Sequence, residues 1–189
     1  MSQDLKIWEF LKSKGLSNCG TAGLIGNLYA ESELICNRVE TLCLQRLRAA
    51  GKNYTDDTYT QAVDDGIISA EEFLHPLPGK QYGYGLAQWT SPGRKAGLYT
   101  MAKNRCVSIA NLEVQLDFLW KELTESYPGV LSVLKSAKAV REASDIFLKK
   151  FECPADTGEK VQILRAGYGQ KYYDKYAGAL PVSDGGTKK

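Results

Sequence analysis

The chain has 189 residues, of which 43% are hydrophobic and 24% charged, the balance of an ordinary globular domain with a core of its own. Its net charge of +2 is too small to indicate a nucleic-acid partner, although it suits an anionic polymer such as a cell wall. No apolar run is long enough to cross a bilayer, so no membrane insertion is expected. No Sec-type signal is visible at the N-terminus, which predicts another export route or a longer parent chain.

Hydrophobic periodicity predicts a mainly α architecture. Helices are expected, in chain order, over residues 3–14, 19–32, 40–50, 111–125, 139–151 and 159–177. Between them, residues 52–79 are polar and predict short helices and turns. Residues 81–90 mix aromatics with glycine before a Ser-Pro-Gly turn signal, and they predict a small β element. Strands and helices do not alternate along the chain, which excludes a Rossmann or barrel enzyme.

The cysteines and the single histidine offer little chemistry. The five cysteines are widely spaced and form no Cys-x-x-Cys pair or Cys/His cluster, so no metal site is expected. Cys36 and Cys43 are close enough in sequence to pair, but free thiols are the simpler expectation. His75 lies between prolines in a predicted loop, a position more typical of a structural or exposed residue than of a hydrolase base.

The predicted helix over residues 19–32 is apolar and unusually rich in small residues. Gly20, Gly23 and Gly26 recur at every third position. Because each glycine in a helix costs about 1 kcal/mol relative to alanine, their presence indicates that another backbone packs closely against this helix.

Glu31 stands at the end of that helix. The C-terminal end of a helix carries partial negative charge, and both this charge and partial burial favour a protonated carboxyl. A protonated carboxyl near neutral pH is what general acid catalysis needs. The alternative interpretation is a solvated glutamate just past a helix end.

A second segment, Gly83–Trp89, supplies aromatic faces and an amide. Sugar rings have apolar CH faces and hydroxyl rims, and their binding sites combine aromatic platforms with a few polar groups. The glycines would let a ligand approach the backbone closely. The alternative interpretation is a tight hairpin that uses its aromatic side chains to stabilise the fold.

The two segments together carry a resemblance. Glu31-Ser32 followed by Gly85-Leu86-Ala87-Gln88 resembles the lysozyme-like superfamily, which includes goose-type lysozymes and soluble lytic transglycosylases. The closer resemblance is to the phage-tail lysozyme family, through the Gly23–Ser32 helix and the Gly83–Thr90 segment with Gly93-Arg94 after it. The same resemblance extends to three later stretches: Gln115–Trp120, Phe151-Glu152-x-Pro154 and Lys171-Tyr172-Tyr173.

This resemblance implies a lysozyme-like helical domain over residues 1–178, with residues 179–189 as a flexible tail or linker. It implies cleavage of the β-1,4 bond between N-acetylmuramic acid and N-acetylglucosamine in bacterial peptidoglycan. Glu31 would be the general acid, and Ser32 and Gln88 would contact substrate. Tyr84 and Trp89 would bound the sugar subsites, unless they belong to the core.

The resemblance also implies the setting in which the protein works. No metal or organic cofactor is expected, because acid catalysis by a carboxyl group needs none. The expected location is the extracellular cell wall, reached with a phage tail or a secretion apparatus. Further domains of a longer chain, such as a wall peptidase, are plausible neighbours.

Three alternatives stay open at this stage. A hydrolase needs a second carboxylate or a positioned water, and residues 52–79 contribute six acidic candidates. They are Asp56, Asp57, Asp64, Asp65, Glu71 and Glu72. Glu33 is a weaker candidate, expected to point away from the site. Without a second carboxylate, the enzyme would be a lytic transglycosylase that releases an anhydro sugar. The other two alternatives are not enzymes: a peptidoglycan-binding module that has lost its catalytic activity, and a helical adaptor protein.

Overall fold

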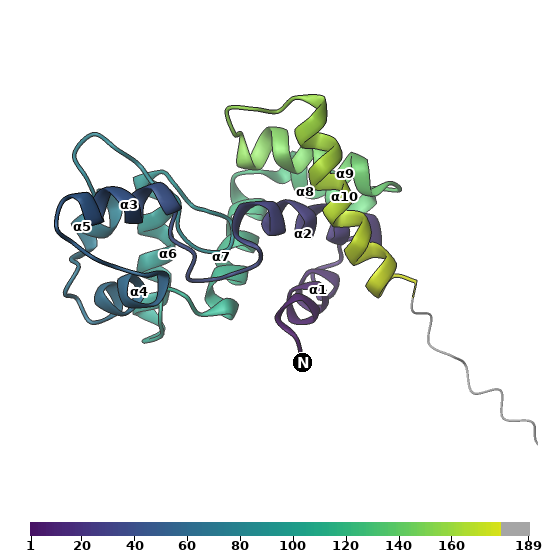
Figure 1. Cartoon of the computed structure of the whole chain (residues 1–189). Helices are drawn as coiled ribbons and strands as arrows, with labels where there is room; N and C mark the ends of the chain where they lie inside the picture. Colours follow the sequence, from purple (N-terminus) through teal and green to yellow (C-terminus); the bar gives the residue numbers. More distant parts are fainter. Residues whose placement is uncertain (179–189) are drawn as a thin grey trace, which may run out of the picture.

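The computed structural model describes residues 1–178, which fold into a mainly helical domain (Figure 1). The tail predicted over residues 179–189 lies outside the described part. The elements are α1 (Gln3–Ser13), α2 (Asn18–Ser32), α3 (Thr41–Ala49), α4 (Asp56–Asp64), α5 (Ala70–Leu74), α6 (Pro92–Asn104), α7 (Leu112–Glu125), α8 (Pro128–Ser136), α9 (Val140–Phe147), the π-helical turn η1 (Leu148–Glu152) and α10 (Glu159–Tyr176).

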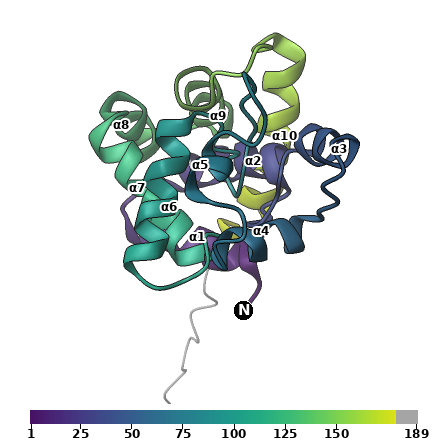
Figure 2. The same ribbon diagram turned by 90° about the vertical axis from the view of Figure 1, so that its left-hand side faces the viewer.

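The helices form two groups joined through α7. Figure 1 shows α3, α4, α5 and α6 on one side and α1, α2, α8, α9 and α10 on the other. In Figure 2, seen from the side of the first group, α2 lies near the centre of the molecule. The C-terminal end of α2, which carries Glu31, therefore points from the second group toward the first.

The small residues of α2 allow three other segments to pack against its backbone. A Cβ atom at Gly20 would overlap the carbonyl of Leu134, and one at Gly26 would fall on the backbone of Gly169 in α10. At Gly23 the added atom would lie 2.7 Å from the backbone nitrogen of Ser144 in α9. The close backbone packing predicted from the glycine spacing is confirmed.

The predicted helices are confirmed, with differences at three places. Ser91 caps the N-terminus of α6 and Pro92 occupies its first turn, so the Ser-Pro-Gly signal begins a helix that the turn interpretation missed. Pro128 begins α8 in the same way, and this helix was not among those predicted. The predicted helix over 139–151 is interrupted, because α9 gives way to η1 at residue 148.

The β element expected over residues 81–90 is smaller than a strand. Within the described residues it consists of isolated antiparallel bridges that pair Tyr84 with Val39 and with Trp89. All five cysteines are free, so Cys36 and Cys43 do not pair. Among residues 1–178, no helix combines the length and apolarity needed to cross a bilayer.

Candidate active site

Glu31 lies in the last turn of α2, where the helix crosses α10. Its side chain is 18% exposed, and Oε1 accepts a hydrogen bond from Nη2 of Arg165 at 2.5 Å. Arg165 also donates from Nη1 to the side-chain oxygen of the buried Asn27, one turn earlier on α2, at 3.3 Å. The α10 arginine therefore anchors the Glu31 carboxylate at the edge of the core.

The two segments that carry the resemblance are in direct contact. Ser32 Oγ donates to the backbone carbonyl of Leu86 at 2.8 Å, which ties the end of α2 to the glycine-rich segment. The chain after α2 then runs beside that segment, because Gly85 N donates to Arg38 O at 2.8 Å and Glu40 N donates to Gly83 O at 3.0 Å. These backbone contacts fix Gln88 relative to Glu31.

Glu31 and Gln88 line the same pocket, which has a volume of about 380 Å³. Gln88 has a left-handed backbone (φ +44°), a conformation that costs a non-glycine residue energy and that is typical of functional sites. Its side-chain nitrogen donates to the carbonyls of Arg38 and Gly85, both at 3.0 Å, so the amide is held in place. The complete lining is Ala30, Glu31, Ser32, Glu33, Arg38, Val39, Glu40, Thr41, Leu42 and Gln88.

The expectation that Tyr84 and Trp89 contact sugar is not met. Their side chains are 1% and 0% exposed and belong to the core. The Tyr84 hydroxyl is 2.8 Å from Thr60 Oγ1, and the Trp89 indole nitrogen donates to Glu122 at 2.7 Å. Ser32 is also buried, at 2% exposure, and its hydroxyl is used within the fold. The hairpin interpretation of this segment is therefore the one that describes its aromatic side chains.

Other partly exposed aromatic rings lie where α2 meets α10. Tyr29, on the last turns of α2, packs edge-on against Tyr168 and Tyr172 of α10, with ring centroids 4.8 and 6.1 Å apart. The three half-buried tyrosines line a pocket of about 230 Å³ together with Asp4, Lys171 and Lys175. None of the three was among the predicted site residues.

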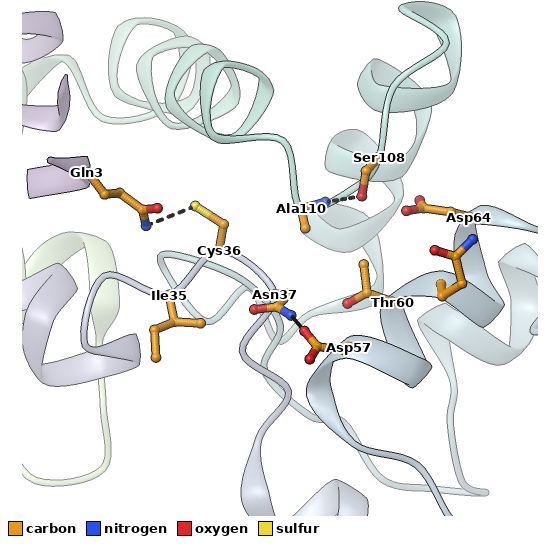
Figure 3. Close-up of a pocket in the computed structure, with 10 residues that line it drawn as sticks. Gln3, Ile35, Cys36, Asn37, Asp57, Thr60, Asp64, Ser108 and Ala110 are labelled. Atoms are coloured by element: carbon orange, nitrogen blue, oxygen red, sulfur yellow. Dashed lines mark hydrogen bonds between the residues drawn. The ribbon is translucent and has the colours of Figure 1, made fainter. Parts of the chain in front are cut away.

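None of the six acidic residues of 52–79 lines the Glu31 pocket itself. Asp57 and Asp64 face a different polar pocket, of about 490 Å³, shown in Figure 3. There, Asp57 accepts from Asn37 at 2.6 Å, while Asp64 accepts from the backbone of Ile109 at 3.0 Å. Asp56 adjoins the Glu31 pocket, because it accepts from the lining residues Arg38 at 3.2 Å and Val39 at 3.0 Å. The other carboxylates of that pocket are Glu33, which the sequence analysis rated weakly, and Glu40.

Arg165 was not predicted as a site residue, because hydrophobic periodicity does not select a buried charge. On α10, Leu164 is 55% exposed while its neighbour Arg165 is buried. The usable signal was Gly169, which lies four residues after Arg165 on the same helical face and meets the backbone of α2.

Glu152 is a second acid that was quoted only as part of a motif. It ends η1, and burial raises the pKa of its carboxyl well above the ordinary value. The nearby Glu31 raises this pKa further, while Arg165 and Arg94 lower it. Glu31, Arg165 and Glu152 thus form one electrostatic group at the α2 end.

The mainly helical architecture is that of a lysozyme-like helical domain, as the sequence predicted. The chain belongs to the phage tail lysozyme family, since comparison with protein families matches residues 2–176 to it. Its activity is peptidoglycan lysis, and its setting is the phage tail. The comparison with curated proteins found no match.

Proposed function

We propose that this protein is a muramidase that cleaves the β-1,4 bond between N-acetylmuramic acid and N-acetylglucosamine, with Glu31 as general acid. The observation that carries the proposal is the shared pocket of Glu31 and Gln88, built where the end of α2 meets the glycine-rich segment. The pocket is lined mainly by polar and charged groups, which suits a hydroxyl-rich glycan.

The reaction would begin with proton donation from the Glu31 carboxyl to the glycosidic oxygen, so that the leaving sugar departs as an alcohol. A water molecule would then complete hydrolysis at the anomeric carbon. Of the pocket's remaining carboxylates, Glu40 accepts the backbone N–H of Gly83 at 2.9 Å, whereas Glu33 is 68% exposed and pairs with Arg38 at 3.4 Å. Glu33 is therefore the better candidate to activate that water.

The glycan chain needs contacts beyond the cleaved bond. Tyr168 and Tyr172 lie about one and two turns of α10 after Arg165, and Tyr29 of α2 packs against both. We assign the aromatic sugar contact to these three partly exposed rings in place of Tyr84 and Trp89. Lys175 in the same pocket is paired with Asp4 at 2.6 Å, so Lys171 leaves the pocket with net positive charge, which suits the carboxylates of the muramyl peptides.

Replacing Glu31 by glutamine tests the proposal. The amide keeps the size of the side chain but cannot donate an acidic proton, so release of soluble glycan fragments from purified peptidoglycan should fall by at least about 100-fold. The circular dichroism spectrum and wall binding should be retained. Glu125→Gln, on the exposed end of α7, is the matched control and should keep full activity. Unchanged turnover in Glu31→Gln would remove Glu31 from the mechanism.

A further inference from the structure

Glu152 occupies an unusual backbone position. It ends the π-helical turn η1, which is closed by a hydrogen bond from Cys153 N to Leu148 O at 2.9 Å. Cys153, the next residue, has a left-handed backbone (φ +48°). Single π-helical turns cost helix stability and are frequent at functional sites. This local geometry turns the Glu152 side chain inward, and its Oε1 is buried without a hydrogen-bond partner among the described residues.

Charged groups from four helices surround this carboxyl. They are Glu31 of α2, Arg94 of α6, Glu122 of α7 and Arg165 of α10. On its own element, Lys149 and Lys150 are exposed. Glu122 is already satisfied, because it accepts from both Arg94 and the Trp89 indole. Glu152 therefore lies within electrostatic range of two ion pairs, Arg94 with Glu122 and Arg165 with Glu31.

Burial of a carboxyl with an unpaired oxygen favours the protonated form, because an unpaired buried charge is costly. In the arrangement described, the charge of Arg165 is used by Glu31, so an ionised Glu152 would be a buried anion without a direct partner. If the proton is instead on Glu31, Arg165 is free to neutralise Glu152. Arg165 can thus neutralise only one of the two carboxylates at a time. The low-energy states of Glu31 and Glu152 together therefore contain one proton.

We propose that Glu152 is a positioning residue for Glu31, and that the two carboxyls share one proton across Arg165. The inference rests on the proposed role of Glu31 as the acid. In the resting state the proton is on Glu152, and Arg165 holds the Glu31 carboxylate. In the reactive state the proton is on Glu31, which leaves the arginine and faces the pocket, while Glu152 becomes the anionic partner of Arg165.

The proton balance of the reaction is closed by the water that attacks the sugar. Glu31 gives its proton to the glycosidic oxygen, and the pair is then fully ionised. The attacking water adds its oxygen to the anomeric carbon and gives its proton to Glu33, the proposed base. Glu33 releases that proton to solvent, and the pair takes up one proton from solvent, which restores the singly protonated state. Glu152 thereby explains how a carboxylate that is ion-paired at rest can act as an acid during turnover.

The test is the pH profile of kcat/KM for the wild type and Glu152→Gln. Glutamine imitates the protonated carboxyl but cannot take the negative charge, so the reactive state loses the partner of Arg165. The alkaline limb should move to lower pH, with kcat reduced about 10-fold at pH 7, near wild-type activity at pH 5 and KM unchanged. Glu142→Gln, an exposed residue of α9, is the control and should follow the wild type. Superimposed profiles, or a loss that is the same at every pH, would overturn the inference.

A second measurement keeps the inference testable if Glu152→Gln does not fold. The Glu152 carboxyl is followed by carbon NMR with labelled glutamate in the wild type and in Glu31→Gln. Removing the Glu31 charge should lower the titration midpoint of Glu152 by about one pH unit, because the like-charge repulsion is lost. An unchanged midpoint would show that the two carboxyls are not coupled. Full activity of Glu31→Gln would instead refute the proposed function itself, independently of this coupling.

Discussion

Tyr84 and Trp89 show that an aromatic side chain beside glycines can either pack in the core or contact a ligand. Both were plausible sugar platforms from their setting between glycines, yet their polar atoms are satisfied inside the fold by Thr60 and Glu122. Nothing in the sequence distinguishes a ring that stacks on a sugar from one that fills a core. The deciding facts are long-range contacts, such as Trp89 to Glu122.

If Trp89 belongs to the core and Tyr168 contacts the sugar, substitutions at the two positions should have opposite effects on stability and on KM. Trp89→Phe removes the N–H bonded to a buried carboxylate, so it should lower the free energy of unfolding by about 1–3 kcal/mol and leave KM unchanged. Tyr168→Ala, on the surface of α10, should raise KM for soluble glycan fragments several-fold with little loss of stability. Urea denaturation and steady-state kinetics of both variants check this, and a reversed pattern would return the sugar contact to Trp89.

Lys95 is a buried cation with a predictable effect on stability. It is 1% exposed, its ammonium lies 3.4 Å from the carbonyl of Tyr82, and burial lowers its pKa to about 8. Because the folded-state pKa is below the ordinary 10.5, the full cost of burying the charge applies below pH 8 and is relieved between pH 8 and 10.5.

Lys95→Met removes this cost. The variant should be more stable than the wild type at pH 7, by up to about 3 kcal/mol, and the difference should shrink as the pH rises toward 10. Urea denaturation of both proteins at pH 7 and 9.5 measures the two differences. A difference that does not depend on pH would mean that Lys95 is not held at a lowered pKa.

At the scale of elements, the crossing of α2 and α10 places Arg165 against Glu31. The glycine pattern of α2 predicted a close helix contact, but it could not identify the partner helix. That identity depends on Gly169, where an added Cβ would lie 2.7 Å from the carbonyl of Ala22. Hydrophobic periodicity could not point to Arg165, because this residue is buried by pairing with a charged group rather than by hydrophobicity.

Two glycines of α10 test this crossing. Gly169→Ala should lower the free energy of unfolding by about 1–3 kcal/mol, because the added methyl overlaps the α2 backbone, and it should reduce activity by displacing Arg165. Gly167→Ala has open space around it, so it should raise stability by up to about 1 kcal/mol through helix propensity. Thermal unfolding of the pair checks the contrast, and equal effects would contradict the packing.

At the scale of the whole molecule, the candidate site is assembled from distant parts of the chain. Glu31 ends α2, Gln88 follows it by more than fifty positions, and Glu152 and Arg165 come from η1 and α10. The sequence predicted most of the helices and the position of Glu31 at the end of α2, because periodicity and helix ends are local signals. It could not predict that Arg165 pairs with Glu31 or that Asp57 and Asp64 face a different pocket, because these contacts follow from tertiary packing.

Mass spectrometry of the soluble products from purified peptidoglycan identifies the bond that is cut and the chemistry that cuts it. We expect muropeptides with reducing N-acetylmuramic acid ends, released by the wild type and absent after Glu31→Gln. Products ending in 1,6-anhydro sugars would contradict hydrolysis and assign the same acid to a lytic transglycosylase. Reducing ends at N-acetylglucosamine, or fragments cut only within the peptides, would contradict the assigned bond.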